Sequence, residues 1–153
     1  MNKYNIENKP GTYALLLKNK LNRNIRVGKL GIYTFQPGYY FYLGSALGPG
    51  GLRGRLNRHI RRNKKKHWHI DYIRSSMKLL EIWYAVQNKN SECLWASKLK
   101  LLAKNSKEII KFGSSDCKCK SHLIFSTELP DNNKFLNSVS QDITSLKLKR
   151  DTD

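Results

Sequence analysis

The Gly-Pro-Gly-Gly run at residues 48–51 separates two stretches with different periodicities. Before it, the aromatic run at residues 39–44 is short and β-prone, which predicts a strand. After it, Leu52, Leu56 and Ile60 recur every four residues, as on the buried face of a helix. Glycine and proline at the junction interrupt regular structure. We therefore expect the chain to pass from strands into a helix that packs against them.

The rest of the chain also alternates between extended and helical patterns. Helices are expected at residues 67–76 and 92–103, and extended segments at residues 12–17, 25–35, 79–87 and part of 108–129. This order predicts an α/β (α+β) fold with a small central, mostly antiparallel sheet of about three to four strands flanked by helices. We expect residues 1–130 to form a single domain and residues 131–153 a polar C-terminal tail.

The chain has a net charge of +18 over 153 residues, and a long stretch of its first half contains basic but no acidic residues. The 14 Lys and Arg residues between Glu7 and Asp71 have no acidic residue among them. Such a field attracts polyanions, most simply nucleic-acid phosphates, whereas a solvated basic surface and a membrane surface are alternatives. We expect DNA as the partner, with RNA as an open alternative. The expected contacts are Arg53, Arg58, Arg62, Lys64, Lys65, Lys66, His67 and His69.

The N-terminal residues and the cysteines bear on the compartment. Residues 1–10 lack the apolar segment of a signal peptide, and no apolar run approaches the ~20 residues of a membrane span. The three cysteines are an odd number, which favours reduced thiols or metal ligands over a disulfide framework. We expect a cytoplasmic, nucleoid-associated protein without a membrane partner.

The helix after residue 51 carries polar side chains that suit phosphate chemistry. Arg55, His59 and Arg62 are spaced by four and three residues, so they are expected to share one helix face. Tyr42 lies on the preceding strand and can meet Arg55 and His59 at one end of the sheet. Arginine offers a planar pair of donors to a phosphate, and tyrosine and histidine can hold or deprotonate a water. A buried aromatic beside solvated arginines is the alternative explanation.

These residues resemble the motifs of the GIY-YIG nuclease superfamily. Its second motif corresponds to Tyr42-Leu43-Gly44, its essential helix arginine to Arg55 in GLRGRL, and the residue one turn later to His59. The runs GTY, VGKLG, PGYYFYLGSALGPGGLRGRLNRH, HWHIDY and FGSSDCKC extend the resemblance over about residues 11–124. Over this length the chain is similar to a stand-alone, largely archaeal branch of the superfamily, formerly classed as a domain of unknown function.

Two Gly-x-Tyr runs can match the first motif of the superfamily. One is Gly11-Thr12-Tyr13 and the other is the literal Gly31-Ile32-Tyr33. The branch that the chain resembles opens with a Gly-Thr-Tyr strand, so the resemblance favours Tyr13. Tyr33 is then expected to be an aromatic residue packed on the sheet.

The resemblance implies hydrolysis of a phosphodiester with Mg²⁺ or Mn²⁺. Tyr13 would hold or activate the attacking water, and Arg55 would stabilise the charge that develops on the phosphate. Tyr42 and His59 would orient the site.

The resemblance also places a metal-binding glutamate on the last core helix. Glu92 is the only acidic residue of the helix expected there, which makes it the candidate ligand. A shifted alignment places the ligand position near Ser97 instead. Asp71 is a further carboxylate that could complete the site, and a helix N-terminal acid is the alternative role of Glu92.

Two other groups of residues have the chemistry of metal ligands. His67, His69 and Asp71 would face one side on a strand but would separate on a helix, where phosphate contacts are the alternative. A second group has the composition of a tetrahedral zinc site, although free buried thiols are the alternative: Cys93, Cys117, Cys119 and His122.

Two functions are consistent with these patterns. The first is a metal-dependent endonuclease that hydrolyses phosphodiester bonds in DNA, structure-selective in repair or recombination because the chain has no evident recognition domain. The second is a non-catalytic nucleic-acid-binding module on the same scaffold. A carboxylate within reach of Tyr13 and Arg55 favours the enzyme.

Overall fold

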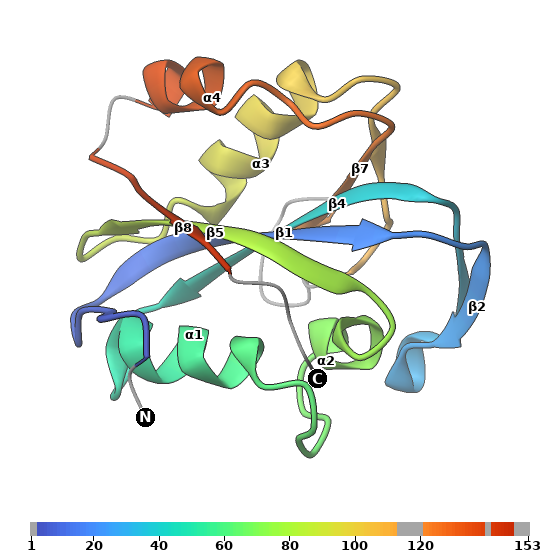
Figure 1. Ribbon diagram of the computed structural model, residues 1–153, viewed down its shortest axis with the longest axis horizontal. Coiled ribbons are helices and arrows are strands. Elements are labelled where there is room, and N and C mark those ends of the chain that lie inside the picture. Colours follow the sequence, from blue (N-terminus) through green and yellow to red (C-terminus); the bar gives the residue numbers. More distant parts are fainter. Residues whose placement is uncertain (1–2, 113–120, 140–141, 149–153) are drawn as a thin grey trace.

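A computed structural model of the protein describes residues 3–112, 121–139 and 142–148. These residues form a six-stranded sheet with helices on both faces, and a separate two-stranded sheet (Figure 1). The strand order in the large sheet is β6-β7-β4-β1-β5-β8, and every neighbouring pair is antiparallel. The expected mixed class with an antiparallel sheet is confirmed, but the sheet has six strands rather than three to four.

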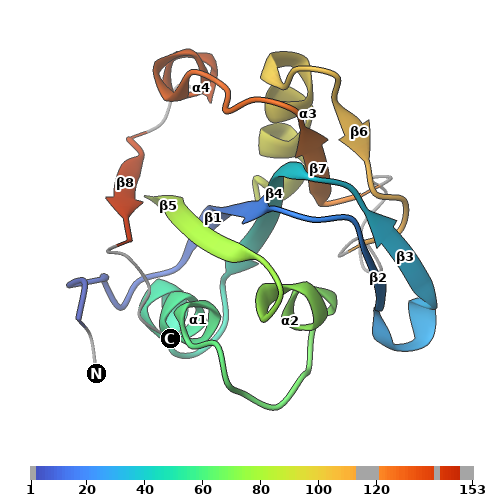
Figure 2. The same ribbon diagram turned by 45° about the vertical axis from the view of Figure 1, so that its right-hand side comes forward.

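The elements of the first half of the chain are β1 (Gly11–Asn19), β2 (Arg23–Arg26), the short 3₁₀-helix η1 (Gly28–Leu30), β3 (Ile32–Phe35), β4 (Gly38–Ala46), α1 (Gly51–Ile60) and α2 (His69–Arg74). Those of the second half are β5 (Lys78–Val86), α3 (Glu92–Leu102), β6 (Lys107–Glu108), β7 (Leu123–Ser126), α4 (Asn132–Val139) and β8 (Thr144–Lys147). The β2–β3 pair forms the separate sheet, beside one end of the main sheet (Figure 2).

Strand β1 lies inside the sheet, paired with β4 on one edge and β5 on the other. Its side chains alternate between two hydrophobic clusters. Tyr13, Leu15 and Leu17 belong to the cluster beneath α1 and α2, and Ala14 and Leu16 belong to the cluster beneath α3 and α4. Because both faces of the strand are covered, its sequence is an almost continuous apolar run rather than an alternating one.

The glycines before α1 bring the helix close to the start of the sheet. Gly50 and Gly51 have φ values of 86° and 56°, a left-handed backbone that other residues adopt at a cost. A Cβ on Gly51 would lie 2.7 Å from the carbonyl oxygen of Lys9. The helix then buries Leu52 and Leu56, as their spacing predicts. None of the helices in the described ranges is both long enough and apolar enough to cross a membrane.

Two C-terminal elements are part of the packed structure rather than a tail. Phe135 of α4 is fully buried in the cluster that contains Trp95, and β8 pairs with β5 from Thr144 to Lys147. The expected boundary at residue 130 therefore does not mark the edge of the fold. The pattern of β8 is short and polar, and its neighbour β5, rather than its own composition, makes it a strand.

Candidate active site

Side chains from four elements meet in a pocket of about 510 Å³ at one end of the main sheet. Tyr13 comes from the start of β1, Tyr42 from β4, Arg55 from α1 and Glu92 from the first turn of α3. The rest of the wall includes Ser45, His67, Trp68, His69, Asn90 and His122. The structure thus brings together residues that are up to 109 positions apart in the sequence.

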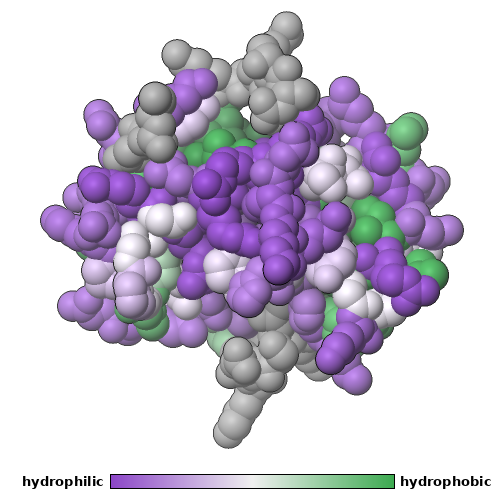
Figure 3. Space-filling model, turned by 90° about the horizontal axis from the view of Figure 1, so that it is seen from below, coloured by the Kyte–Doolittle hydropathy of each residue, from purple (hydrophilic) through white to green (hydrophobic). Residues whose placement is uncertain are grey.

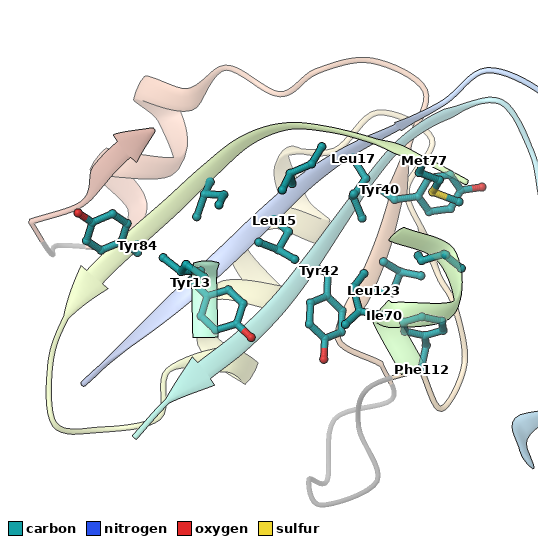
Figure 4. Packing of buried hydrophobic residues seen from close by; sticks show 14 of the residues in the cluster. Tyr13, Leu15, Leu17, Tyr40, Tyr42, Ile70, Met77, Tyr84, Phe112 and Leu123 are labelled. Carbon is teal, nitrogen blue, oxygen red and sulfur yellow. The ribbon is translucent and has the colours of Figure 1, made fainter. Parts of the chain in front are cut away.

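The two tyrosines occupy neighbouring strands of this site. Figure 4 shows Tyr13 and Tyr42 side by side on β1 and β4, with both hydroxyl groups directed toward the same side of the sheet. Gly44 is the β4 residue directly opposite Tyr13. A Cβ on Gly44 would lie 2.4 Å from the Tyr13 hydroxyl oxygen. The glycine of the Tyr-Leu-Gly motif therefore leaves the space that the Tyr13 ring occupies.

Tyr13 and His59 form a buried hydrogen-bonded pair. The distance between Tyr13 Oη and His59 Nε2 is 2.7 Å, and both side chains are almost completely buried. Burial, reinforced by the positive charge of Lys64, lowers the pKa of His59 well below its usual value. Burial also raises the pKa of Tyr13, against the opposing effect of Arg55. At neutral pH the pair is therefore an un-ionised phenol beside a neutral imidazole, and in the tautomer with its proton on Nδ1 the Nε2 accepts the hydrogen bond from the phenol.

Arg55 is held in place by a carbonyl group and an indole ring. Its Nη1 donates a hydrogen bond of 3.0 Å to the carbonyl oxygen of Ser45. Its guanidinium carbon lies 4.2 Å from the centre of the Trp68 ring, and the guanidinium carbon of Arg58 lies 4.4 Å from the same centre. These contacts fix a permanent positive charge at the pocket wall without neutralising it.

Asp71 has a structural role that excludes it from the metal set considered above. Its two carboxylate oxygens accept hydrogen bonds of 2.9 Å from Arg58, and one also accepts from the backbone N–H groups of His67 and Trp68. Burial alone would raise the pKa of Asp71, but these donors hold it at about 2. Because α2 begins at His69, the three residues His67, His69 and Asp71 do not alternate on a strand. Both histidines instead line the pocket.

Lys64 is turned inward rather than toward solvent. Its ammonium group donates hydrogen bonds of 2.8 Å to the carbonyl oxygens of Arg58 and Arg61, at the C-terminal end of α1. Only 7% of its side chain is exposed. Burial lowers the pKa of Lys64 to about 8, although Asp71 acts in the opposite direction. Lys64 therefore stabilises the end of the helix, whereas the sequence suggested a nucleic-acid contact.

The remaining basic residues of this half of the chain differ in exposure. Arg53, Lys65 and Lys66 are exposed, and hydrophilic side chains cover the molecule on the side of α1 and α2 (Figure 3). Helix α1 ends at Ile60, so Arg62 lies beyond it and does not share a helix face with Arg55. Arg62 lines a different pocket.

Glu92 is the carboxylate that lies in the pocket wall. Its Oε2 is 3.4 Å from His122 Nδ1 and 3.4 Å from the side-chain nitrogen of Asn90. Ser97, the alternative ligand position, donates to the carbonyl oxygen of Leu94 and does not line the pocket. Within the described ranges, no group of three or more His, Cys, Asp and Glu side chains could hold a metal ion. A single carboxylate nevertheless fits Mg²⁺ or Mn²⁺, because Mg²⁺ commonly keeps its waters and takes one or two carboxylates plus substrate phosphate.

The proposed zinc set is only partly described. Cys117 and Cys119 lie outside the described residues. Cys93 is disulfide-bonded, so the expectation of reduced thiols is wrong for this residue and its sulfur is not a thiolate ligand. His122 Nε2 lies 3.8 Å from Cys93 Sγ, while Nδ1 of the same ring faces Glu92.

Tyr33 lies away from the pocket. It belongs to β3 in the two-stranded sheet, and its hydroxyl donates a hydrogen bond of 3.0 Å to the carbonyl oxygen of Ile110. Of the two Gly-x-Tyr runs, the structure thus places the one with Tyr13 beside Tyr42, Arg55 and His59.

Sequence reasoning did not assign a role to Trp68 or Asn90. Trp68 directly follows a basic run, and an aromatic ring beside arginines is a pattern typical of cation–π stacking. Asn90 belongs to a polar turn, and its sequence alone indicates no role. The turn places its side-chain nitrogen beside the Glu92 carboxylate in the pocket wall.

A protein-family model matches residues 12–145, which is most of the chain. Its description is "Domain of unknown function DUF123". The chain belongs to the DUF123 family. Comparisons with curated proteins and with solved structures find no significant match. The DUF123 match includes every pocket residue named above, and it extends past the expected boundary at residue 130, through α4 into β8.

Proposed function

We propose that this DUF123 protein is a metal-dependent endonuclease of the GIY-YIG type, which hydrolyses phosphodiester bonds in DNA. The observation that carries the proposal is the meeting of Tyr13, Tyr42, Arg55, His59 and Glu92 around one pocket. These five residues come from four separate elements, and they supply a proton acceptor, a fixed cation and a carboxylate.

Arg55 binds the scissile phosphate. Its guanidinium is already held by Ser45 and Trp68, so little ordering is needed when the substrate arrives. Its planar donors match two phosphate oxygens and stabilise the negative charge that builds on them during attack. Lysine would carry the same charge without this geometry.

Tyr13 and His59 move the proton of the attacking water. The water donates its proton to Tyr13 Oη as it bonds to phosphorus, and Tyr13 passes its own proton to His59 Nε2 across the 2.7 Å contact. The bond from phosphorus to one sugar oxygen breaks at the same time, and that leaving oxygen takes a proton from solvent. The phenol is therefore neutral before and after the step, and His59 becomes the imidazolium. The burial that lowers the pKa of His59 keeps its imidazole neutral at neutral pH, and the step uses the tautomer that carries its proton on Nδ1, so that Nε2 can accept.

Glu92 would hold the divalent ion, with Asn90 and His122 orienting its carboxylate. Mg²⁺ or Mn²⁺ bound there would act as a Lewis acid toward the phosphate. Tyr42 lies across the His59 ring, with ring centres 6.2 Å apart, and keeps the imidazole in place. The exposed basic residues, including Arg53, would hold the flanking DNA by its phosphates.

A non-catalytic nucleic-acid-binding module is the second candidate. It is favoured by the single carboxylate in the pocket wall, because the described residues offer no larger ligand group for a metal. In that case Arg55 and its neighbours would bind a phosphate without cleaving it.

Cleavage of a labelled panel distinguishes the two candidates. The panel contains plain, nicked, flapped and four-way DNA and an RNA hairpin, each incubated with Mg²⁺, with Mn²⁺ and with a chelator. Arg55→Ala is compared with Arg26→Ala, which removes the same charge from an exposed position outside the pocket. Metal-dependent cleavage lost only in Arg55→Ala supports the nuclease and identifies the preferred substrate. Tight binding without cleavage under either metal supports the binding module.

A further inference from the structure

A second basic pocket lies at the other end of β1 from Tyr13. Its volume is about 300 Å³. It is lined by five cationic side chains and one hydroxyl group: Lys18, Lys20, Arg23, Arg62, Lys78 and Ser76. No acidic residue of the described chain is among its lining residues. The cations come from β1, the turn after it, β2, the segment after α1 and β5, so the fold rather than a basic run collects them.

The strand register places two of these cations face to face. Lys18 of β1 is the direct partner of Lys78 of β5. Like charges at directly opposed positions of an antiparallel pair repel one another and destabilise the sheet. A register shift between Leu16 and Leu17 sets this alignment. Such shifts often re-aim side chains near functional sites.

A buried amide supports the pocket from behind. Asn19, which is 1% exposed, donates hydrogen bonds of 3.1 and 3.0 Å to the carbonyl oxygens of Phe35 and Gln36. Its Oδ1 accepts a hydrogen bond of 3.1 Å from Arg23 Nε. Arg23 is thus oriented by a rigid group, as an anion-binding arginine requires.

We propose that the pocket around Lys18 and Lys78 binds a backbone phosphate of the nucleic acid whose other phosphate lies at Arg55. This inference rests on the proposed function for the phosphate at Arg55. Lys18 is five residues beyond Tyr13, or about 16 Å along a strand that rises ~3.3 Å per residue. Because the two residues are an odd number of positions apart on β1, their side chains lie on opposite faces of the sheet. The nucleic acid would therefore pass around the end of β1, where Arg62, which follows α1, lines the same pocket as Lys18.

The test is the affinity of a 20-base-pair duplex, measured by fluorescence anisotropy with a chelator present so that cleavage does not intervene. The double variant Lys18→Gln, Lys78→Gln is compared with Lys98→Gln, Lys134→Gln, which removes the same charge from α3 and α4. We expect at least a tenfold loss of affinity in the first variant and less than a twofold loss in the second. In the first variant, the slope of the binding constant against salt concentration should also fall by an amount equal to about one or two phosphate contacts. The double variant Lys18→Arg, Lys78→Arg should retain the affinity, which shows that a loss in the glutamine variant reflects charge rather than misfolding.

Equal losses in the two glutamine variants, or no loss in either, would overturn the pocket as a phosphate site. The cleavage panel is read separately with Mg²⁺ present. A wild-type protein that does not cleave, but whose binding depends on Lys18 and Lys78, contradicts the nuclease and supports the pocket. A wild-type protein that cleaves DNA, but whose affinity does not depend on Lys18 and Lys78, supports the nuclease and contradicts the phosphate site.

Discussion

Tyr13 Oη lies 2.7 Å from His59 Nε2, in a buried contact that joins β1 to α1 across 46 positions of the sequence. Two features give this contact its chemical value. The phenol opens onto the pocket that Arg55 and Glu92 share, and the imidazole behind it is kept neutral by burial. A proton taken up at the pocket wall therefore has a place to go within the protein.

Replacing Tyr13 by Phe removes the hydroxyl and keeps the ring. We expect the rate of cleavage to fall at least about 100-fold, because the proton path is cut, while duplex affinity changes less than about twofold. Single-turnover cleavage and anisotropy measure the two quantities. Tyr33→Phe is the control, because its hydroxyl bonds to Ile110 outside the site. A loss in Tyr33→Phe equal to that in Tyr13→Phe would contradict the assignment.

Replacing Arg55 by Lys keeps the charge and removes the planar group that stacks on Trp68. We expect kcat/KM for cleavage to fall about 100-fold, whereas the Kd for DNA rises no more than about threefold. Arg26→Lys is the matched control at an exposed position outside the pocket. Parallel losses of cleavage and of affinity in Arg55→Lys would show that Arg55 only binds.

Replacing Gly44 by Ala places a methyl group where the Tyr13 ring lies. The new carbon would be 2.4 Å from Tyr13 Oη, so the ring must move away from His59. We expect cleavage to fall at least about tenfold and the protein to lose about 1–3 kcal/mol of stability from overpacking. Gly48→Ala is the control, because nothing lies within 4 Å of its added carbon. The cleavage rate and the unfolding free energy in urea are measured for both variants. Equal values in Gly44→Ala and Gly48→Ala would show that the clash with Tyr13 is not the cause of the loss.

Asp71 makes the stability of the protein depend on acid pH. Its pKa is about 2 in the folded state, below the ordinary 3.8, so the folded protein releases this proton more readily than the unfolded chain. The stabilisation is complete above pH about 4 and is lost as the pH falls through about 2, a change of about 2 kcal/mol. Urea denaturation at several pH values should show this loss in the wild type but not in Asp71→Asn. The exposed Asp142→Asn should follow the wild type, and a wild-type-like curve for Asp71→Asn would refute the ion pair as its cause.

Replacing Glu92 by Gln removes the carboxylate from the pocket wall with little change in shape. We expect Mg²⁺-dependent cleavage to fall at least about 100-fold. Calorimetric titration should also show weaker Mn²⁺ binding to the Glu92→Gln protein. Glu128→Gln, on the exposed side of the molecule, is the control. Unchanged Mn²⁺ affinity in Glu92→Gln would place the metal elsewhere.

The parts of the fold with long apolar patterns could be predicted from the sequence. The apolar run at residues 12–17 predicts a strand, which is β1 in the structure. The spacing of Leu52 and Leu56 predicts a helix, which is α1. The strands β6 and β8 could not be predicted in this way. They are two and four residues long and largely polar, and only their partners in the sheet make them strands.

Only part of the candidate site could be predicted from the sequence. Tyr13, Tyr42 and Arg55 belong to short sequence motifs, and all three lie in the pocket. A run of basic residues does not indicate which cations remain available, and the fold commits Lys64 to carbonyl groups and Arg58 to Asp71. These assignments depend on where α1 ends and α2 begins, which charge alone does not determine.

The position of β1 has a consequence for the order of events during synthesis. This strand leaves the ribosome before its partners β4 and β5, which end at Ala46 and Val86. Until β5 has been made, the apolar run 12–17 has at least one bare edge, a state prone to association with other chains. A nascent chain stalled before residue 86 would be the form of this protein most in need of a chaperone.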